Sequence, residues 1–258
     1  MSIDFSADAG ESFGRWILGD DDELMKHVTS VNVACGFHGG DPSWMRNSVE
    51  LAKRYGVDLG AHPGFLDFLG FGWQNLAVSA EEVIDMCVYQ VGALMAFAKS
   101  AGVHLTHVKP HGSLNMMMNQ NADLLAKFAD AMLALQSDLD IVALAGPSAE
   151  MLRDRGVSVR VEVVADMEYD DNGVCINERT PLWKDPQHVA ARAIELASGV
   201  LKTVGGNEFE IQADSLCIHG NRPNAVEVAF AVRAGLSSAG LEVVAPPLQS
   251  NPTKNARR

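Results

Sequence analysis

The sequence predicts an α/β fold, a seven-stranded (β/α) barrel that spans residues 1–245 as a single domain. Short runs of β-prone residues alternate with longer helical patterns, and seven such runs follow one another along the chain. This alternation is typical of parallel sheets covered by helices, and seven repeats suit a closed barrel. A doubly wound open sheet is the alternative. The expected strands lie near 2–7, 28–35, 57–61, 104–109, 139–145, 158–165 and 214–218.

The segments between these runs have the periodicity of amphipathic helices. Apolar residues recur at helical spacing, as at Val83, Cys87 and Val91, and several segments open on a cap signal and close on glycine. An irregular stretch at 166–185 indicates a hairpin or lid after the sixth strand, and 205–207 indicates a turn. The expected helices lie at 41–55, 79–101, 121–136, 147–155, 186–203 and 223–239.

Composition narrows the classes of partner. The formal net charge of -13 argues against nucleic acid, because a phosphate backbone would be repelled. The chain has four scattered cysteines and no C-x-x-C pair, which is typical of reduced thiols in a cytoplasmic protein. We see no signal peptide and no uninterrupted run of 18 apolar residues, so we expect no membrane partner. Residues 246–258 are predicted to form a polar C-terminal tail.

Polar side chains follow the predicted strands, mostly beside glycine or proline. In a parallel barrel the carboxyl ends of all strands meet at one face, and active sites are built there. Single polar residues in loops carry little information, but four of the eight histidines lie in this register. We therefore predict a catalytic site at this face. Its candidate residues are Asp8, Glu11, His38, Asp41, His62, Lys109, His111, Asp166 and His219.

Three chemistries are compatible with these residue types. Asp8, His62 and His111 form a set that would bind a divalent metal with open positions. Lys109 and the histidines would instead polarise a carbonyl and stabilise an oxyanion, with a carboxylate as general base. The glycine-rich strand ends would hold a phosphate near helix N-termini. The chain contains neither a P-loop motif nor a G-x-G-x-x-G fingerprint.

Taken in order, the motifs resemble the LamB/YcsF family from about residue 3 to residue 244. Members of that family serve as the A subunit of the prokaryotic ATP-dependent 5-oxoprolinase. The resemblance implies a seven-stranded (β/α) barrel akin to carbohydrate and polysaccharide deacetylases, and all nine candidate positions match the family motifs. It also implies that the lactam of 5-oxo-L-proline is opened to L-glutamate with ATP hydrolysis, together with the B and C subunits. The motifs are S-A-D-A-G-E-S-F-G, N-V-A-C-G-F-H-G-G-D-P, L-G-A-H-P-G-F and H-V-K-P-H-G-S-L.

The arrangement of Asp8, His62 and His111 is also similar to the metal triad of the YdjC-type deacetylases. The fourth-strand motif of those enzymes carries an aspartate where this chain has Lys109. An ammonium at that position would repel a divalent cation. The sequence therefore leaves a divalent metal cofactor open.

Departures from the family pattern gather in the predicted lid and after the last strand. Met167 and Glu178 stand where the family usually has arginines, and Arg222 is added. Losing guanidinium groups removes bidentate partners for a carboxylate or phosphate, and Arg179 or Arg222 would restore one from a shifted position. We expect Arg179, Arg222 and the retained Tyr169 to contact the substrate. The substrate-recognition rim is thus predicted to have changed while the core chemistry is kept.

The leading expectation is the A subunit of an ATP-dependent 5-oxoprolinase. A metal-dependent amidohydrolase or deacetylase acting on another lactam or amide is one alternative, and a ligand-binding subunit without turnover is another. The sequence does not decide whether ATP binds this chain or a partner, or whether copies associate into a homo-oligomer.

Overall fold

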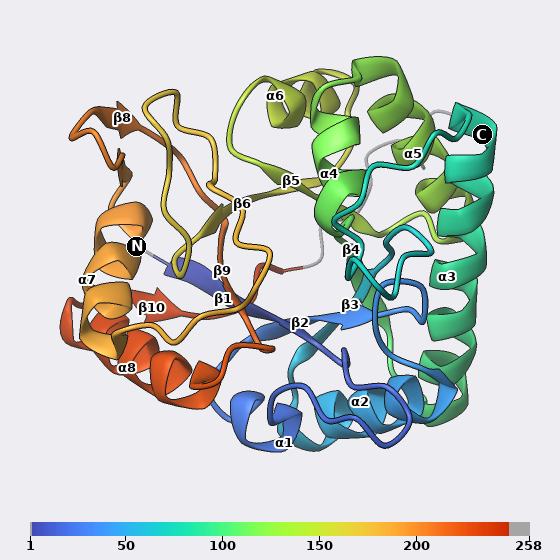
Figure 1. Ribbon diagram of the computed structural model, residues 1–258, viewed down its shortest axis with the longest axis horizontal. Coiled ribbons are helices and arrows are strands. Elements are labelled where there is room, and N and C mark those ends of the chain that lie inside the picture. Colours follow the sequence, from blue (N-terminus) through green and yellow to red (C-terminus); the bar gives the residue numbers. More distant parts are fainter. Residues whose placement is uncertain (1, 248–258) are drawn as a thin grey trace.

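Seven parallel strands close into a barrel in the computed structural model, which describes residues 2–247 (Figure 1). Each strand pairs with the next along the chain, and the last pairs with the first, so the sheet has no open edge within this ring. The predicted barrel is therefore confirmed, and the open-sheet alternative is wrong. The strands are β1 (Ser2–Ala9), β2 (Ser30–Ala34), β3 (Asp58–His62), β4 (Leu105–Val108), β5 (Asp140–Leu144), β6 (Val159–Val164) and β9 (Ser215–His219).

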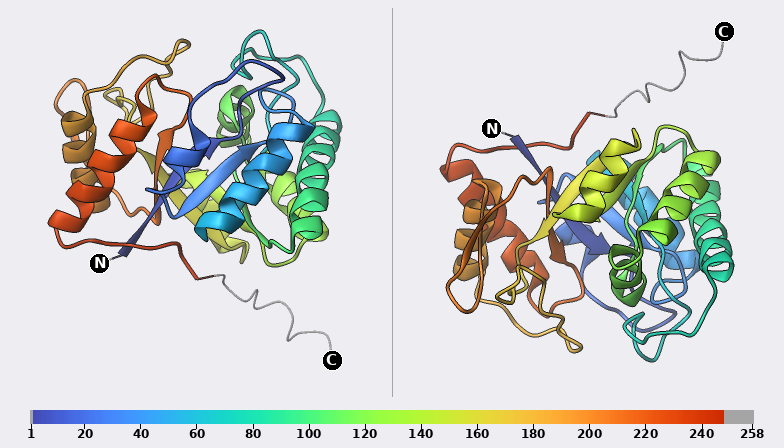
Figure 2. Two further views of the ribbon diagram at one scale, coloured as in Figure 1. Left: turned by 90° about the horizontal axis from the view of Figure 1, so that it is seen from below. Right: turned by 90° about the horizontal axis from the view of Figure 1, so that it is seen from above.

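Helices surround the ring of strands (Figure 1). In both views of Figure 2 the last two long helices lie together on one side of the barrel, with the longest helix on the opposite side. Local signals determine their ends: Ser79 and Glu82 form a capping box, and Gly56 and Gly102 adopt left-handed C-cap conformations. The helices are α1 (Asp21–Leu24), α2 (Pro42–Tyr55), α3 (Ala80–Ala101), α4 (Gly112–Asn119), α5 (Ala122–Leu135), α6 (Pro147–Asp154), α7 (Pro186–Ala197) and α8 (Ala225–Ser238).

The amino-terminal end of the barrel is filled by an ion network. The buried Arg160 guanidinium bonds Asp140 at 2.8 Å and Asp58 at 3.2 Å, and it lies 3.9 Å from Asp4. Ser215 donates a hydrogen bond to the Asp4 carboxylate at 2.7 Å, which joins the last strand to the first. Because charged side chains close this end, the barrel can be hollow only at the opposite end, where the strands terminate.

Several elements differ from the predictions. The helix expected at 186–203 ends at Ala197, because Gly199 has a positive φ of 92° and the next residues pair as β7 (Val200–Lys202) with β8 (Glu208–Glu210). The predicted turn at 205–207 joins these two strands. Helix α4 was not predicted, and it has no side-chain cap that could mark its start. A short strand, β10 (Glu242–Val243), pairs with the beginning of β1. From residue 248 onward, the predicted tail lies outside the described residues.

Helix α3 is long and apolar enough, by length and composition, to cross a membrane. In the structure it packs on the barrel beside α2 and α5, and it buries Val83, Cys87 and Leu94. Its buried Gln90 exchanges hydrogen bonds with the backbone of Gly64, at 2.9 and 3.0 Å. The apolar face is thus that of an outer helix on a barrel.

Candidate functional site

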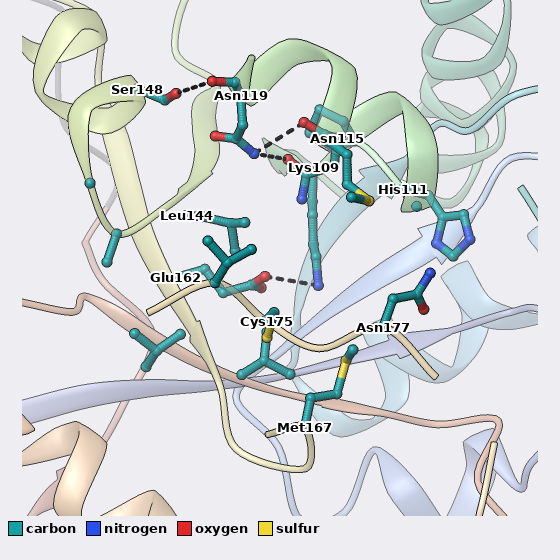
Figure 3. Close-up of a pocket in the computed structure, with 18 of the residues that line it drawn as sticks. Lys109, His111, Asn115, Asn119, Leu144, Ser148, Glu162, Met167, Cys175 and Asn177 are labelled. Atoms are coloured by element: carbon teal, nitrogen blue, oxygen red, sulfur yellow. Dashed lines mark hydrogen bonds and ion pairs between the residues drawn. The ribbon is translucent and has the colours of Figure 1, made fainter. Parts of the chain in front are cut away.

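A cavity of about 350 Å³ opens at the carboxyl ends of the strands. Its floor is formed by Asp8, His62, Lys109, Glu162 and His219, which come from five strand ends or strand interiors. Helix α4 and the 166–185 hairpin form its walls, and Figure 3 shows Lys109 reaching toward Glu162, with Cys175 and Met167 below this contact in the view. The predicted face therefore does carry a cavity of the size that binds a small molecule.

Lys109 lies at the centre of the floor. Its Nζ is 2.8 Å from Asp8 Oδ1, 3.0 Å from Glu162 Oε1 and 3.2 Å from Cys217 Sγ. Burial lowers the pKa of Lys109. The neighbouring Asp8, Cys217 and Glu162 raise it by more than burial lowers it, so the net pKa is well above its ordinary value. Burial raises the pKa of Glu162, and the Lys109 ammonium only partly offsets this. The floor thus holds a buried ammonium shared between two carboxyl groups.

Asp8 is placed by the pairing of β1 with its two neighbours, which sets it opposite Asn32 on β2 and His219 on β9. The Asn32 amide donates a hydrogen bond to Asp8 Oδ1 at 2.9 Å, and His62 Nε2 lies 3.3 Å from Asp8 Oδ2. Burial raises the pKa of Asp8, whereas His62 and Lys109 lower it more, and the net pKa lies well below its ordinary value. Asp8 is therefore an ionised, acceptor-only group facing the cavity.

His219 and Asp166 form a second pair beside Asp8. His219 Nδ1 lies 2.9 Å from Asp166 Oδ1, and its Nε2 lies 3.8 Å from Asp8 Oδ2. Burial raises the pKa of Asp166, but His219 and then Arg222 lower it well below its ordinary value. Burial lowers the pKa of His219, and the Asp166 carboxylate raises it beyond this loss. The Asp166 carboxylate thus orients the imidazole and favours its protonated form.

The 166–185 segment is a hairpin, with an antiparallel bridge between Tyr169 and Cys175. Arg222 ties it down: its guanidinium contacts Asp166 and donates to Glu178 Oε2 at 2.8 Å. Glu178 also pairs with Lys184. Two departures from the family pattern, Glu178 and Arg222, are therefore partners of each other.

The three residues expected to contact substrate are placed differently. Arg222 is buried, and its donors are used by Asp166, Glu178 and a lid carbonyl, so it holds the lid instead of facing the cavity. Tyr169 lines the cavity, but its hydroxyl bonds both backbone groups of Val164. Arg179 is exposed and does not line the cavity.

Asp41 is not brought to the cavity with the other strand-end residues. Its carboxylate caps α2 by accepting hydrogen bonds from the backbone N–H groups of Ser43 and Trp44, and it also accepts from Gly14. Burial raises the pKa of Asp41, but the three backbone hydrogen bonds together lower it more, so the net pKa lies below its ordinary value. Its place is that of a helix cap, which the Asp-Pro sequence at 41–42 also indicates.

Four buried side chains form a cluster beside the floor that shares His62 with it: Glu11, His38, His62 and His111. Their ligand atoms all lie within 4.8 Å of one another, so the group could hold a metal ion. It shares His62 and His111 with the predicted metal set, whereas Asp8 is bound by Lys109 and Asn32 and lies outside this group. The His38 and His111 rings stack, with centroids 3.7 Å apart.

Sequence reasoning missed several residues of the site. Glu162 is the clearest, and an acidic residue inside the apolar run of the sixth strand was the available signal. Cys217, one of the four cysteines predicted to be reduced thiols, was not among the candidate residues, and its sulfur contacts Lys109. Asn115 and Asn119 of α4 also line the cavity and are hydrogen-bonded to each other at 2.8 Å (Figure 3).

Comparisons with known proteins agree with this architecture. The 5-oxoprolinase A subunit of Pyrococcus furiosus is 40% identical over 248 residues, which cover 95% of this chain and 97% of that protein. Its counterpart from Thermus thermophilus is 43% identical, covering 94% and 99%. A crystal structure of a lactam utilization protein from Thermus thermophilus superposes with a TM-score of 0.87 at 42% identity, covering 95% of this chain and all of that one.

More distant structures share the fold alone. A family 4 carbohydrate esterase from Streptomyces lividans is 12% identical and superposes with a TM-score of 0.52, covering 97% of this chain and 95% of the esterase.

The model of the LamB/YcsF family matches residues 3–251, nearly the whole sequence. The chain belongs to the LamB/YcsF family.

Proposed function

We propose that this chain is the A subunit of an ATP-dependent 5-oxoprolinase, which opens the lactam of 5-oxo-L-proline to L-glutamate together with the B and C subunits. One observation carries the proposal: a buried ammonium, held by two carboxyl groups, lies on the floor of a cavity sized for a small molecule. The similarity to proteins named as the 5-oxoprolinase A subunit supports the choice of substrate.

The floor supplies the groups that amide hydrolysis needs. Lys109 Nζ has three donor positions: two point to Asp8 and Glu162, and the third, which lies 3.2 Å from the weak acceptor Cys217 Sγ, turns to the lactam carbonyl oxygen. A fixed cation there stabilises the oxyanion that forms when water attacks the carbonyl carbon. Asp8 accepts a hydrogen bond from that water and draws off its proton. Lys109 thus polarises the carbonyl, and Asp8, its ion-pair partner, activates the water.

His219 supplies the proton that the leaving nitrogen requires. Its Nδ1–H donates to Asp166, which turns Nε2 toward Asp8 and the cavity. When the bond between the carbonyl carbon and the lactam nitrogen breaks, Nε2–H protonates that nitrogen, and the ring opens to a single product that carries the new carboxylate and the amine. The Asp166 carboxylate keeps the imidazole in this orientation, as a carboxylate does for the histidine in hydrolase triads.

We place the ATP chemistry in the complex and assign no nucleotide site to this chain, because it lacks both standard phosphate-binding motifs. We also propose the cytoplasm as its compartment. All four cysteines are free thiols, and three of them are buried, as expected where thiols stay reduced.

The test is to purify the chain with the B and C subunits and to follow glutamate release from 5-oxo-L-proline. We expect ATP-dependent release that Lys109→Ala abolishes. The exposed Lys127→Ala serves as a matched control and should leave release unchanged. Absence of ATP-dependent glutamate from the wild-type complex, above the level of Lys109→Ala, would refute the proposal.

A further inference from the structure

Glu11, His38, His62 and His111 have no role in the lactam chemistry described above. All four are at most 3% exposed. Within residues 2–247, both carboxylate oxygens of Glu11 and both ring nitrogens of His38 lack a hydrogen-bond partner, and the two groups approach only to 3.7 Å. A buried polar group without a partner costs free energy, so native proteins nearly always provide one. Four such atoms in one place indicate a partner that protein atoms do not supply.

The other two histidines point to a cation as that partner. His62 Nδ1 lies 2.7 Å from the Lys109 carbonyl oxygen, and His111 Nε2 lies 2.8 Å from that of Phe71. A carbonyl only accepts, so each ring donates one N–H there, and in the neutral form of the ring the other nitrogen keeps a lone pair. Those two nitrogens, His62 Nε2 and His111 Nδ1, face each other at 3.0 Å. Two facing lone pairs repel unless a cation lies beside them.

This pattern also matches the outer contacts of metal-binding histidines. Such histidines commonly donate their second N–H to a backbone carbonyl, which fixes the tautomer and the direction of the lone pair. Here one of the carbonyls belongs to Phe71, a non-glycine residue with a positive φ of 53°. Strain of this kind persists where the surrounding structure requires it, commonly at functional sites.

The loop that carries Phe71 is shaped to the histidine rings. A Cβ at Gly64 would lie 2.5 Å from His38 Nδ1, and one at Gly72 would lie 2.6 Å from His111 Cδ2. Only glycine lets the backbone approach the rings this closely. The rings are therefore held in place from outside, while His62 and His111 border the cavity and give access from it.

The donor set selects a class of ion. Three imidazoles and one carboxylate, without a thiolate, suit zinc, cobalt, iron or nickel better than magnesium or calcium. Bonds of about 2.0–2.1 Å to a tetrahedral ion place ligand atoms about 3.3–3.4 Å apart. The pairs His62–His111 and His38–Glu11 stand at 3.0 and 3.7 Å, on either side of that value. The Lys109 ammonium would repel a cation, but its positive charge is balanced by its ion pairs with Asp8 and Glu162.

We propose that Glu11, His38, His62 and His111 form a binding site for one divalent transition-metal ion of the zinc class. Glu11 and His38 enter it in place of Asp8, which stays with Lys109. The site stands independently of the proposed lactam activity, because its donors are not those that act on the lactam.

Binding is measured on the full chain, stripped with a chelator and freed of any histidine tag. Isothermal titration with zinc chloride should give one site per chain. Glu11→Gln and His38→Gln should each weaken binding at least about tenfold, the scale seen even for outer contacts of metal sites. His104→Gln is the matched control, because His104 is half exposed and remote from the cluster, and it should bind as the wild type does.

A second readout uses cobalt and does not depend on variants that might fail to fold. Cobalt(II) bound by three imidazoles and a carboxylate should show intense visible ligand-field bands in the wild type, and zinc should displace them. Zinc should also raise the melting temperature of the stripped wild type. These effects should weaken in Glu11→Gln, a change that keeps the size of the side chain.

The proposal is overturned if the wild type binds neither zinc nor cobalt stoichiometrically, or if folded Glu11→Gln and His38→Gln bind as tightly as the wild type. The first result would mean that a shared proton, and not a metal ion, separates His62 and His111. Failure to bind either ion, together with full glutamate release, would refute the metal site alone. Tight zinc binding without any glutamate release would refute only the proposed function.

Discussion

The floor of the cavity and its lid differ in how their residues are held. Asp8, Lys109 and Glu162 lie on or directly after β1, β4 and β6, and strand pairing fixes them within hydrogen-bond distance. The lid is a loop segment whose position depends on a few side chains, Arg222 and Glu178 among them. Asp8 and Lys109 of the floor lie in the motifs that resemble the LamB/YcsF family, whereas Glu178 in the lid and Arg222, which anchors it, are expected departures from the family pattern. The proposed function places the reaction on the floor and the choice of substrate at the lid.

The largest expected effect comes from the floor. Lys109→Ala removes the cation that meets the oxyanion, so we expect kcat to fall at least about 10²–10³-fold. It also leaves Asp8 and Glu162 buried without their shared partner, which should cost about 3–5 kcal/mol of unfolding free energy. Glutamate release and urea denaturation measure the two effects. A normal kcat in Lys109→Ala would show that the floor does not take part in the reaction.

Arg222→Ala should have the next largest effect, and mainly on stability. Arg222 is buried and contacts Asp166, so its removal leaves that carboxylate with His219 as its remaining charged partner. We expect a loss of about 3 kcal/mol, at the lower end for broken buried pairs, measured by denaturation at neutral pH. Protease cleavage within 166–185 should become faster, because the lid loses its anchor. Unchanged stability and unchanged cleavage would mean that Arg222 does not hold the lid.

The two regions should also respond to pH in opposite directions. Burial raises the pKa of Asp21 to about 6, against a hydrogen bond from the Gly10 N–H beside the floor. Between the ordinary value and about 6 the folded protein binds more protons than the unfolded one, so unfolding free energy falls as pH rises through this window. About two pKa units correspond to about 3 kcal/mol. Asp21→Asn should abolish this loss and raise stability at pH 7.

Asp166, at the start of the lid, should change the unfolding free energy with pH in the opposite direction to Asp21. Its pKa is lowered, so it contributes stability above its ordinary pKa that is lost as the solution is acidified through the folded value. Asp166→Asn should therefore reduce stability at neutral pH and flatten the acid limb of the profile. Melting temperatures of both variants from pH 3 to 8 test the pair. Parallel shifts in the same direction would contradict this assignment.

The smallest effect is expected from the rim of the lid. Glu178 is about one-fifth exposed, and its pairs with Arg222 and Lys184 should contribute about 1 kcal/mol or less. Glu178→Gln removes a negative charge next to Asn177, which lines the cavity, so KM for the anionic 5-oxo-L-proline should fall by about three- to tenfold. The kcat should stay unchanged. Steady-state kinetics of the complex measure both parameters.

Much of the fold and part of the site could be predicted from sequence alone. All seven barrel strands were found, because parallel strands are buried on both faces and form apolar runs. Asp8, His62, Lys109, His111 and His219 were found because they follow those strands and meet at one cavity. Helix α4 and the end of α7 could not be predicted, because neither the start of α4 nor the end of α7 carries a strong local signal.

Contacts between distant segments could not be predicted in the same way. Glu162 lies within a strand, and only the closed barrel shows that its side chain meets Lys109. Arg222 and Glu178 are 44 residues apart, so their pairing depends on how the lid folds. Asp41 looked like its neighbours in sequence, yet its carboxylate turns to the N-terminus of α2. Spacing along the chain identifies strand ends, but not the direction of each side chain.

The division between floor and lid is tested most directly by kcat and KM for 5-oxo-L-proline, measured in parallel on complexes that carry Lys109→Ala or Glu178→Gln. We predict that Lys109→Ala lowers kcat by at least about 10²-fold, whereas Glu178→Gln changes only KM. If Glu178→Gln lowers kcat as strongly as Lys109→Ala does, or if Lys109→Ala affects only KM, the reaction does not take place on this floor.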